Sequence, residues 1–166
     1  MKQILVIEFE RTELIEKIRR KYLPYSNRIE PHVTLVYPFT IDNQNELSKH
    51  ISNSLKKFKP FKVKFRGIQK SVNDFFLYLL VEEGKNIIID LHNRLNGGIL
   101  KDFRNQDMPI YIPHISIGKF ESKNEIDNAI KEISKLNISY ETFVDKIQLL
   151  TIDNKHNLES RKNIKL

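Results

Sequence analysis

Two short segments of the sequence place a histidine beside a hydroxyl, and the two segments resemble each other. Residues 31–35 read Pro-His-Val-Thr-Leu and residues 113–117 read Pro-His-Ile-Ser-Ile, so His32 and His114 stand 82 positions apart. In an extended strand, residues i and i+2 point to the same face. Each histidine therefore shares a strand face with the hydroxyl that follows it, while the apolar residues of the segment point into hydrophobic packing.

This combination of residue types suits general acid–base chemistry on a phosphodiester. Histidine titrates near neutral pH, so His32 and His114 could hold one neutral ring as a general base and one imidazolium as a general acid. The hydroxyls of Thr34 and Ser116 can donate hydrogen bonds to non-bridging phosphate oxygens without adding charge. Water could then attack in line while the leaving sugar oxygen is protonated, and no metal is required. Either histidine could take either role.

Each of these residues also has a structural interpretation. A single histidine in a strand most often serves packing, and β-propensity by itself can explain Thr34, though hardly Ser116. The matched context of the two segments, with a proline before each and a helix expected after each, favours one shared catalytic or phosphate-binding site.

Lys119, Tyr37 and Tyr111 are predicted as possible substrate contacts, and Gly118 as a position that could leave room for the substrate. Lys119 follows the second motif and could bind phosphate, although strict alternation turns it away from His114 unless the strand twists or ends there. The same alternation puts Gly118 on the His114 face, where it could admit substrate closely. Tyr37 and Tyr111 flank the motifs and could stack on a base, whereas aromatic residues at strand edges usually belong to the core.

The remaining histidines have no partner at the spacing of metal ligands. We interpret His50, His92 and His156 as non-functional, and we predict neither a metal site nor a cofactor. The sequence contains no His-Glu-x-x-His motif, no glycine-rich phosphate loop and no dinucleotide-binding fingerprint. Nucleoside triphosphate hydrolysis, dinucleotide redox chemistry and zinc proteolysis therefore lack support.

The motifs need rigid strands, and hydrophobic periodicity predicts strands and helices around them. The expected strands cover residues 2–9, 32–37, 61–69, 74–82, 114–120, 138–152 and 160–165. The expected helices cover residues 12–22, 43–58, a third segment marked by Ile87, Ile88, Leu91 and Leu95, and a fourth from Ser122 through Leu136. Strands 61–69 and 74–82 are expected to pair as an antiparallel hairpin.

Local signals indicate where the helices begin and end. Asn43 and Ser122 each precede a glutamate by three residues, the pattern of a helix N-cap. Gly97 and Gly98 predict a helix stop in the left-handed conformation. A loop of about 14 residues then leads to the second motif, and structureless loops of that length are uncommon outside functional regions.

Composition limits the classes of protein and of chemistry. The 166 residues include 28 Lys and Arg against 21 Asp and Glu, for a formal charge of +7, and no cysteine. A chain of this length suits one domain or two small lobes. Without cysteine, disulfide scaffolds, thiolate metal sites and cysteine nucleophiles are excluded. No apolar run approaches the roughly 20 residues of a membrane helix, and the first residues lack the apolar region of a signal peptide, so a cytoplasmic protein is expected.

The positive charge favours anionic partners such as RNA or nucleotides, while a lysine-rich background composition explains it equally well. Seven cations lie between Lys56 and Lys70, with no acidic residue among them. They form either a solvated helix end and strand face or an electrostatic path that guides RNA to the site. The second interpretation predicts a steep dependence of binding on salt.

The two motifs, His-Val-Thr-Leu at 32–35 and His-Ile-Ser-Ile at 114–117, resemble the hallmark of the 2H phosphoesterase superfamily, which includes 2′-5′ RNA ligase-like proteins and RNA cyclic phosphodiesterases. The resemblance covers nearly the whole chain in its order of strands and helices. It implies an α+β fold with two lobes, in which two antiparallel sheets with flanking helices are related by pseudo-twofold symmetry around a central groove. Residues 1–166 would form a single domain of two intimately packed lobes, each carrying one motif.

The resemblance also implies an activity. A metal-independent phosphoesterase would hydrolyse 2′,3′-cyclic phosphate or 2′-5′ phosphodiester bonds in RNA ends or small nucleotides, with His32 and His114 as the catalytic pair. Members of the superfamily differ in substrate, and the motifs do not choose among them. RNA ends or small phosphorylated nucleotides are the expected partners of a monomer that needs no membrane and no obligate protein partner.

Two other functions remain open from the sequence. The same groove could serve a non-catalytic module that binds RNA ends or nucleotides. Alternatively, the motifs could be relics in a structural protein, which predicts that the imidazoles and hydroxyls are buried against each other.

Overall fold

The computed structural model describes residues 1–72, 75–104, 110–155 and 157–166. The strands are β1 (Lys2–Glu8), β2 (His32–Phe39), β3 (Phe61–Lys70), β4 (Phe76–Glu83), β5 (His114–Lys119), β6 (Ser139–Val144), β7 (Lys146–Ile152) and β8 (Leu158–Lys165). The helices are α1 (Glu13–Tyr22), α2 (Gln44–Leu55), α3 (Lys85–Leu95) and α4 (Lys123–Ile133), with 3₁₀-helices at Gly98–Phe103 and Ser134–Leu136.

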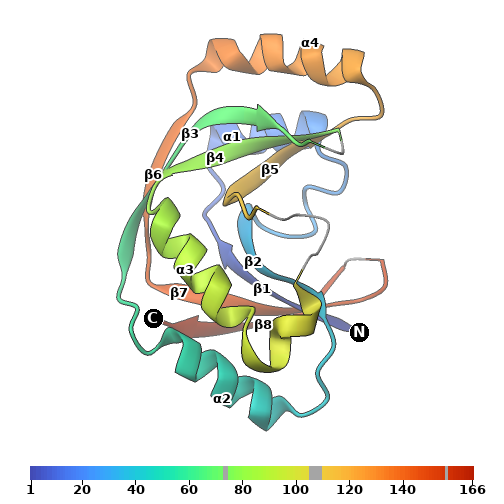
Figure 1. Cartoon of the computed structure of the whole chain (residues 1–166). Coiled ribbons are helices and arrows are strands. Elements are labelled where there is room, and N and C mark those ends of the chain that lie inside the picture. Colours follow the sequence, from blue (N-terminus) through green and yellow to red (C-terminus); the bar gives the residue numbers. More distant parts are fainter. Residues whose placement is uncertain (73–74, 105–109, 156) are drawn as a thin grey trace.

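The strands form two four-stranded antiparallel sheets, which confirms the predicted α+β class (Figure 1). The first sheet has the order β2-β1-β7-β8 and the second has the order β5-β4-β3-β6. The two motif strands, β2 and β5, are each an edge strand of their sheet, and they lie in contact with each other. The order β1-α1-β2-α2 recurs as β4-α3-β5-α4, which is consistent with the expected pseudo-twofold relation.

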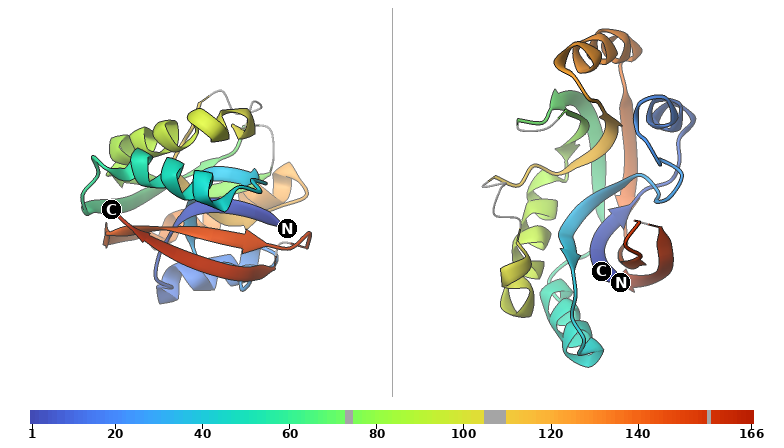
Figure 2. Two further views of the ribbon diagram at one scale, coloured as in Figure 1. Left: turned by 90° about the horizontal axis from the view of Figure 1, so that it is seen from below. Right: turned by 90° about the vertical axis from the view of Figure 1, so that its right-hand side faces the viewer.

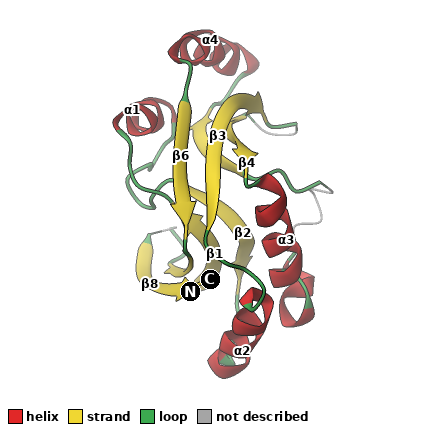
Figure 3. Ribbon diagram, turned by 90° about the vertical axis from the view of Figure 1, so that its left-hand side faces the viewer, coloured by secondary structure: helices red, strands yellow, loops and turns green. Residues whose placement is uncertain are grey.

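Two helices each pack against a motif strand of the sheet opposite to the strand that they precede. Helix α1 leads into β2 but packs against β5, and α3 leads into β5 but packs against β2. Helices α1 and α4 lie at one end of the molecule, while α2 and α3 lie side by side at the other (Figures 2 and 3). Each motif strand is therefore supported by the helix that precedes the other motif.

One cluster of buried apolar side chains runs through both sheets. It includes Val33 and Leu35 from β2, Ile115 and Ile117 from β5, and Phe65 from β3. The apolar residues of both motifs thus pack inward as their alternation predicts, which leaves the opposite strand face for the histidines. A smaller cluster, Ile4, Val6, Leu150 and Ile152, lies on the first sheet alone.

The predicted helix N-caps are present. The Asn43 side chain accepts a hydrogen bond from the Glu46 N–H at 3.2 Å, and the Ser122 hydroxyl accepts one from the Glu125 N–H at 3.3 Å. The return contact of Glu125 goes to the N–H of Glu121, one residue before the cap. These bonds satisfy N–H groups that a helix cannot pair internally.

Three expectations about the helices need correction. The fourth helix was expected to run through Leu136, but α4 ends at Ile133 and a 3₁₀-helix follows at Ser134–Leu136, where Leu136 is 43% exposed. The loop before β5 is not structureless, since a 3₁₀-helix occupies Gly98–Phe103. Of the glycine pair, only Gly98 has a positive φ, at +52°, while Gly97 is extended. The rest of that loop, residues 105–109, lies outside the described residues.

Candidate active site at the two motif strands

The two histidines begin their strands with the same hydrogen bond. His32 donates from Nδ1 to the carbonyl of Glu30 at 2.7 Å, and His114 donates from Nδ1 to the carbonyl of Ile112 at 2.7 Å. Because a carbonyl only accepts, Nδ1 must carry the proton in the neutral ring. Nε2 is then the basic atom, and it makes no hydrogen bond to any described residue in either histidine.

The proline before each histidine is also held in the same way. The Pro31 carbonyl accepts the Phe9 N–H at 2.7 Å, and the Pro113 carbonyl accepts the Val81 N–H at 3.2 Å. Each bond ties the start of a motif strand to the strand beside it. The carbonyl two residues before each histidine is thereby fixed in position, since proline restricts the geometry of its predecessor.

The surroundings of the two rings favour the neutral form of each. Burial lowers the pKa of His32, and the positive charge of Arg19 lowers it as well. Burial, with a smaller contribution from the charge of His32, lowers the pKa of His114 to about 4, so the two rings lie within electrostatic reach of each other. Both side chains keep partial solvent exposure. They are not buried against each other, as a purely structural pair would be.

Matched β-bulges change the faces of both motif strands. In β5, Ser116 lies opposite Tyr78 and Gly118 opposite Leu77, so Ile117 is an extra residue. In β2, Thr34 lies opposite Val6 and Val36 opposite Leu5, so Leu35 is an extra residue. Both bulges thus follow their histidine by three positions. Residues beyond a bulge point to the face opposite to that given by simple alternation.

The bulge in β5 overturns two expectations. Lys119 lies opposite Phe76, which shares a face with Tyr78 and therefore with Ser116 and His114. Lys119 is thus on the face of the histidine, and its Nζ lies 5.5 Å from the ring centroid of Phe76. Gly118 is turned to the other face, where a Cβ atom would lie 2.7 Å from the Phe120 ring, so it does not admit substrate on the His114 face.

The bulge in β2 has the corresponding effect on Tyr37. Tyr37 follows Val36, which faces the core opposite Leu5, so its side chain belongs to the face of His32 and Thr34. It is partly exposed, and burial raises the pKa of its hydroxyl. Tyr37 and Lys119 therefore occupy equivalent positions, each five residues after a motif histidine.

The two hydroxyls stand where the sequence predicts them. Thr34 and Ser116 are partly exposed and share the faces of His32 and His114, since no irregularity separates the members of either pair. Tyr78, which sequence reasoning missed, lies opposite Ser116 and stacks on His114 with ring centroids 3.6 Å apart. Only the register of β4 against β5 could have identified it.

A cluster from the second half of the chain braces the first motif strand. The Tyr111 hydroxyl donates to the Thr34 carbonyl at 2.7 Å, and His92 Nδ1 donates to the Leu35 carbonyl at 2.8 Å. Asn96 donates to the same Leu35 carbonyl at 2.8 Å. The rings of His92 and Tyr111 stack at 3.7 Å and 3°. His92 was interpreted as non-functional. Its contact with the Leu35 carbonyl could not be inferred from its position in the sequence.

Other predicted features lie away from the motif strands. His50 donates from Nε2 to the Leu95 carbonyl at 2.9 Å, and His156 lies outside the described residues. Among the described residues, no group of three or more His, Asp or Glu side chains could hold a metal ion. None of the described helices is long and apolar enough to cross a membrane.

Carboxylates from other elements pair with much of the basic run. Lys62 contacts Glu83 and Glu141, and Lys64 contacts Glu82 and Glu141. Arg66 also contacts Glu82, and Lys70 contacts Asp127 on α4. This favours a solvated, internally neutralised strand face over an electrostatic path for RNA.

Comparisons with known proteins point to one family and agree with the fold. The family model described as the 2′-5′ RNA ligase superfamily matches residues 7–156. A relative from Geobacillus sp. (strain WCH70), named as a proposed phosphoesterase, is 32% identical over 139 residues, which cover 80% of this chain and 76% of the relative. A similarly named protein from Staphylococcus aureus (strain Newman) is 24% identical over 146 residues, covering 85% and 83%.

Solved structures share the whole fold at low sequence identity. LigT of Escherichia coli, in complex with 3′-AMP, has a TM-score of 0.65 at 15% identity and covers 99% of this chain and 98% of its own. Usb1 of Kluyveromyces marxianus has a TM-score of 0.59 at 11% identity, with the same coverage. The fold of two antiparallel sheets with flanking helices is therefore shared with these proteins.

Proposed function

Because the chain belongs to the 2′-5′ RNA ligase superfamily, we propose that it is a phosphoesterase that hydrolyses 2′,3′-cyclic phosphate or 2′-5′ phosphodiester bonds in RNA ends or small nucleotides. The observation that carries this proposal is the pair of Nδ1-anchored histidines at the start of two touching edge strands. Each presents Nε2, the atom that can move a proton, on a partly exposed face.

The proposed reaction divides the proton transfers between the two rings. The Nε2 of one neutral histidine removes a proton from water as the water oxygen bonds to phosphorus. The bond from phosphorus to the leaving sugar oxygen breaks, and the other histidine, as imidazolium, donates its Nε2 proton to that oxygen. The Nδ1 bonds hold both rings in place and leave both Nε2 atoms available for proton transfer throughout. The near-equivalence of the two motifs leaves either histidine able to take either role.

The remaining predicted site residues would hold the substrate. Thr34 and Ser116 can donate hydroxyl hydrogen bonds to the non-bridging oxygens of the scissile phosphate, and Lys119, farther along the same face, adds positive charge for the part of the substrate beyond that phosphate. Tyr78, stacked on His114, limits how that ring can turn. Tyr37 would contact the substrate beside Thr34, while the hydroxyl of Tyr111 is occupied by the Thr34 carbonyl.

The test is activity against a substrate panel of 2′,3′-cyclic nucleotides, 2′-5′ dinucleotides and ADP-ribose cyclic phosphate. We expect hydrolysis of at least one class that survives a chelator and falls by about 10²- to 10⁴-fold in His32→Ala or His114→Ala. His50→Ala is the matched control, since His50 lies on α2 away from the motif strands. Full activity in both motif variants, or a reaction that the chelator stops, would refute the mechanism.

A binding module that uses the same two histidines is the second candidate. It is favoured if nucleotides bind in a manner that depends on His32 and His114 but no bond in the panel is cleaved. Calorimetric titration of the same compounds separates this result from simple inactivity.

A further inference from the structure

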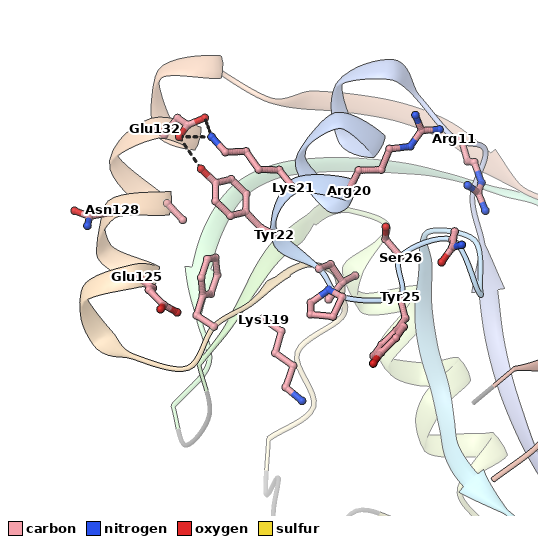
Figure 4. Close-up of a pocket in the computed structure, with 15 residues that line it drawn as sticks. Arg11, Arg20, Lys21, Tyr22, Tyr25, Ser26, Lys119, Glu125, Asn128 and Glu132 are labelled. Carbon is pink, nitrogen blue, oxygen red and sulfur yellow. Dashed lines mark hydrogen bonds and ion pairs between the residues drawn. The ribbon is translucent and has the colours of Figure 1, made fainter. Parts of the chain in front are cut away.

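An open pocket lies beyond the far end of β5 from His114. Its volume is about 900 Å³, and the end of α1, the loop after it, the end of β5 and helix α4 enclose it (Figure 4). Lys119 lines this pocket and also belongs to the His114 face of β5, so this one side chain is common to both regions. Nothing in the proposed cleavage reaction uses the rest of the pocket.

The charges in the pocket leave two cations for a ligand. Glu132 is occupied by Lys21 at 2.5 Å and by the Tyr22 hydroxyl at 2.6 Å, as Figure 4 shows. Glu125 accepts a backbone N–H at the start of α4. Within the part of the chain that the structure describes, no carboxylate contacts Arg20 or Lys119. The pocket therefore favours an anion at these two side chains.

An aromatic side chain is exposed on the wall of the pocket. Tyr25 is 68% exposed, although a large aromatic side chain gains by burial. Its backbone φ is +62°, a conformation that tyrosine rarely adopts. The guanidinium of Arg28 lies 3.8 Å from its ring centroid and supports the ring. A supported, exposed ring is the form of a stacking platform for a nucleobase.

The distance between the pocket and the histidines constrains what could reach both. Five residues of strand separate His114 from Lys119, a span of about 16 Å. The phosphates of a stacked strand follow each other at about 3.4 Å along its axis. A single nucleotide at the histidines cannot reach the pocket, whereas a strand of several nucleotides can.

We propose that this pocket binds the nucleotides next to the cleaved bond, and that the substrate is therefore a single-stranded RNA end and not a mononucleotide. Arg20 and Lys119 contact backbone phosphates, and a base stacks on Tyr25. The proposal rests on the proposed function, because it assumes that the scissile phosphate lies between His32 and His114.

Binding measurements test the pocket without requiring turnover. The probe is a fluorescent RNA hexamer that ends in a 3′-phosphate, with a nucleoside 3′-monophosphate as the short comparison. We expect Arg20→Ala to weaken hexamer binding and to reduce the slope of log Kd against log salt by about 0.7, the loss of one phosphate contact. Tyr25→Asn, which suits the left-handed backbone, should weaken the hexamer by about tenfold. Neither variant should affect the monophosphate.

Lys49→Ala is the matched control, since it removes a charge from the exposed face of α2, at the other end of the molecule. The proposal is overturned if the hexamer binds Arg20→Ala and Tyr25→Asn as it binds the unchanged protein, if Lys49→Ala weakens it equally, or if the monophosphate is weakened to the same extent. If no substrate is cleaved, the proposed function is overturned instead. The hexamer-binding measurements would then still decide whether the pocket binds RNA. Where cleavage occurs, the Arg20→Ala loss in kcat/KM should appear with the hexamer cyclic phosphate and not with the cyclic mononucleotide.

Discussion

At the residue scale, one hydrogen bond decides which nitrogen of each histidine can act. Nδ1 of His32 and of His114 is tied to the carbonyl before its proline, so both rings hold the same tautomer and present Nε2. A neighbouring positive charge further lowers the pKa of each ring, Arg19 for His32 and His32 itself for His114. A pair that resists double protonation can hold a single proton over a range of pH, which a base and acid acting together require.

The lowered pKa values predict an acidic pH optimum for kcat/KM. The base must be above its pKa to be neutral, and the acid must be below its pKa to be protonated, so the maximum lies between the two values. Burial lowers the pKa of both His32 and His114 below the ordinary value of about 6.5, to about 4 for His114. We therefore expect kcat/KM to peak below pH 6.5 and to fall as the pH rises through 7. A peak at or above pH 7 in initial-rate measurements would contradict this assignment.

At the element scale, the matched bulges set which side chains accompany each histidine. A bulge three residues after the histidine turns Lys119 and Tyr37 onto the motif face and turns Gly118 away from it. In β5 the turned residue is a glycine, and the Phe120 ring fills the place that a Cβ atom would take. The position of Lys119 therefore depends on how closely Phe120 packs against the strand.

Gly118→Ala should destabilise the protein by about 1–3 kcal/mol, because the new methyl group would lie 2.7 Å from Phe120 Cε2 and 3.3 Å from Tyr22 Cβ. Urea unfolding measures this change. Gly97→Ala is the control, since its nearest non-neighbouring atom, the Arg94 carbonyl oxygen, is at 3.4 Å and its backbone is extended. Equal stability of the two variants would show that Phe120 can move without cost.

Tyr111→Phe should remove one of the hydrogen bonds by which Tyr111, His92 and Asn96 hold β2. The stacking of its ring on His92 should remain. The Thr34 carbonyl would lose the hydroxyl that binds it at 2.7 Å, at a cost of about 1 kcal/mol. Unfolding in urea gives the change in stability. Tyr140→Phe serves as the control, because the Tyr140 ring stacks on Phe65 while its hydroxyl bonds to no described residue. A loss of stability in Tyr140→Phe as large as that in Tyr111→Phe would argue against a stabilising hydrogen bond from Tyr111 to β2.

At the scale of the whole molecule, the two sheets share one core and exchange their supporting helices. Helix α1 packs on β5 and α3 on β2, so each motif strand depends on the half of the chain that carries the other motif. Tertiary contacts also decide which of the cations behind the net charge of +7 are paired with acidic side chains. On β3 it is paired with acidic residues, while Arg20 and Lys119 keep theirs beside the pocket.

The shared core predicts that both sheets unfold together. Amide signals of Leu35 in β2 and Ile117 in β5, both completely buried, should disappear at the same urea concentration. Two-dimensional NMR along a urea titration follows each residue separately. Loss of one sheet's signals while the other sheet remains folded would show that the halves are independent.

The local features of this protein can be predicted from its amino-acid sequence. The duplicated segments identify His32 and His114, their hydroxyl neighbours follow from the period of two in a strand, and helix caps at Asn43 and Ser122 follow from side chains that bond nearby N–H groups. Each of these depends on residues a few positions apart. The α+β class follows from the same local periodicity together with the family resemblance.

Which distant residues contact these local features depends on the tertiary structure. Strand register is set by contacts between strands, so the bulges that turn Lys119 and Gly118, and the place of Tyr78 opposite Ser116, could not be read from alternation. The acids that neutralise β3 come from other elements, and His92 reaches the Leu35 carbonyl across 57 positions. The sequence lists the charged and polar groups, but their partners depend on how the two sheets pack, because electrostatic and hydrogen-bond contacts form through space.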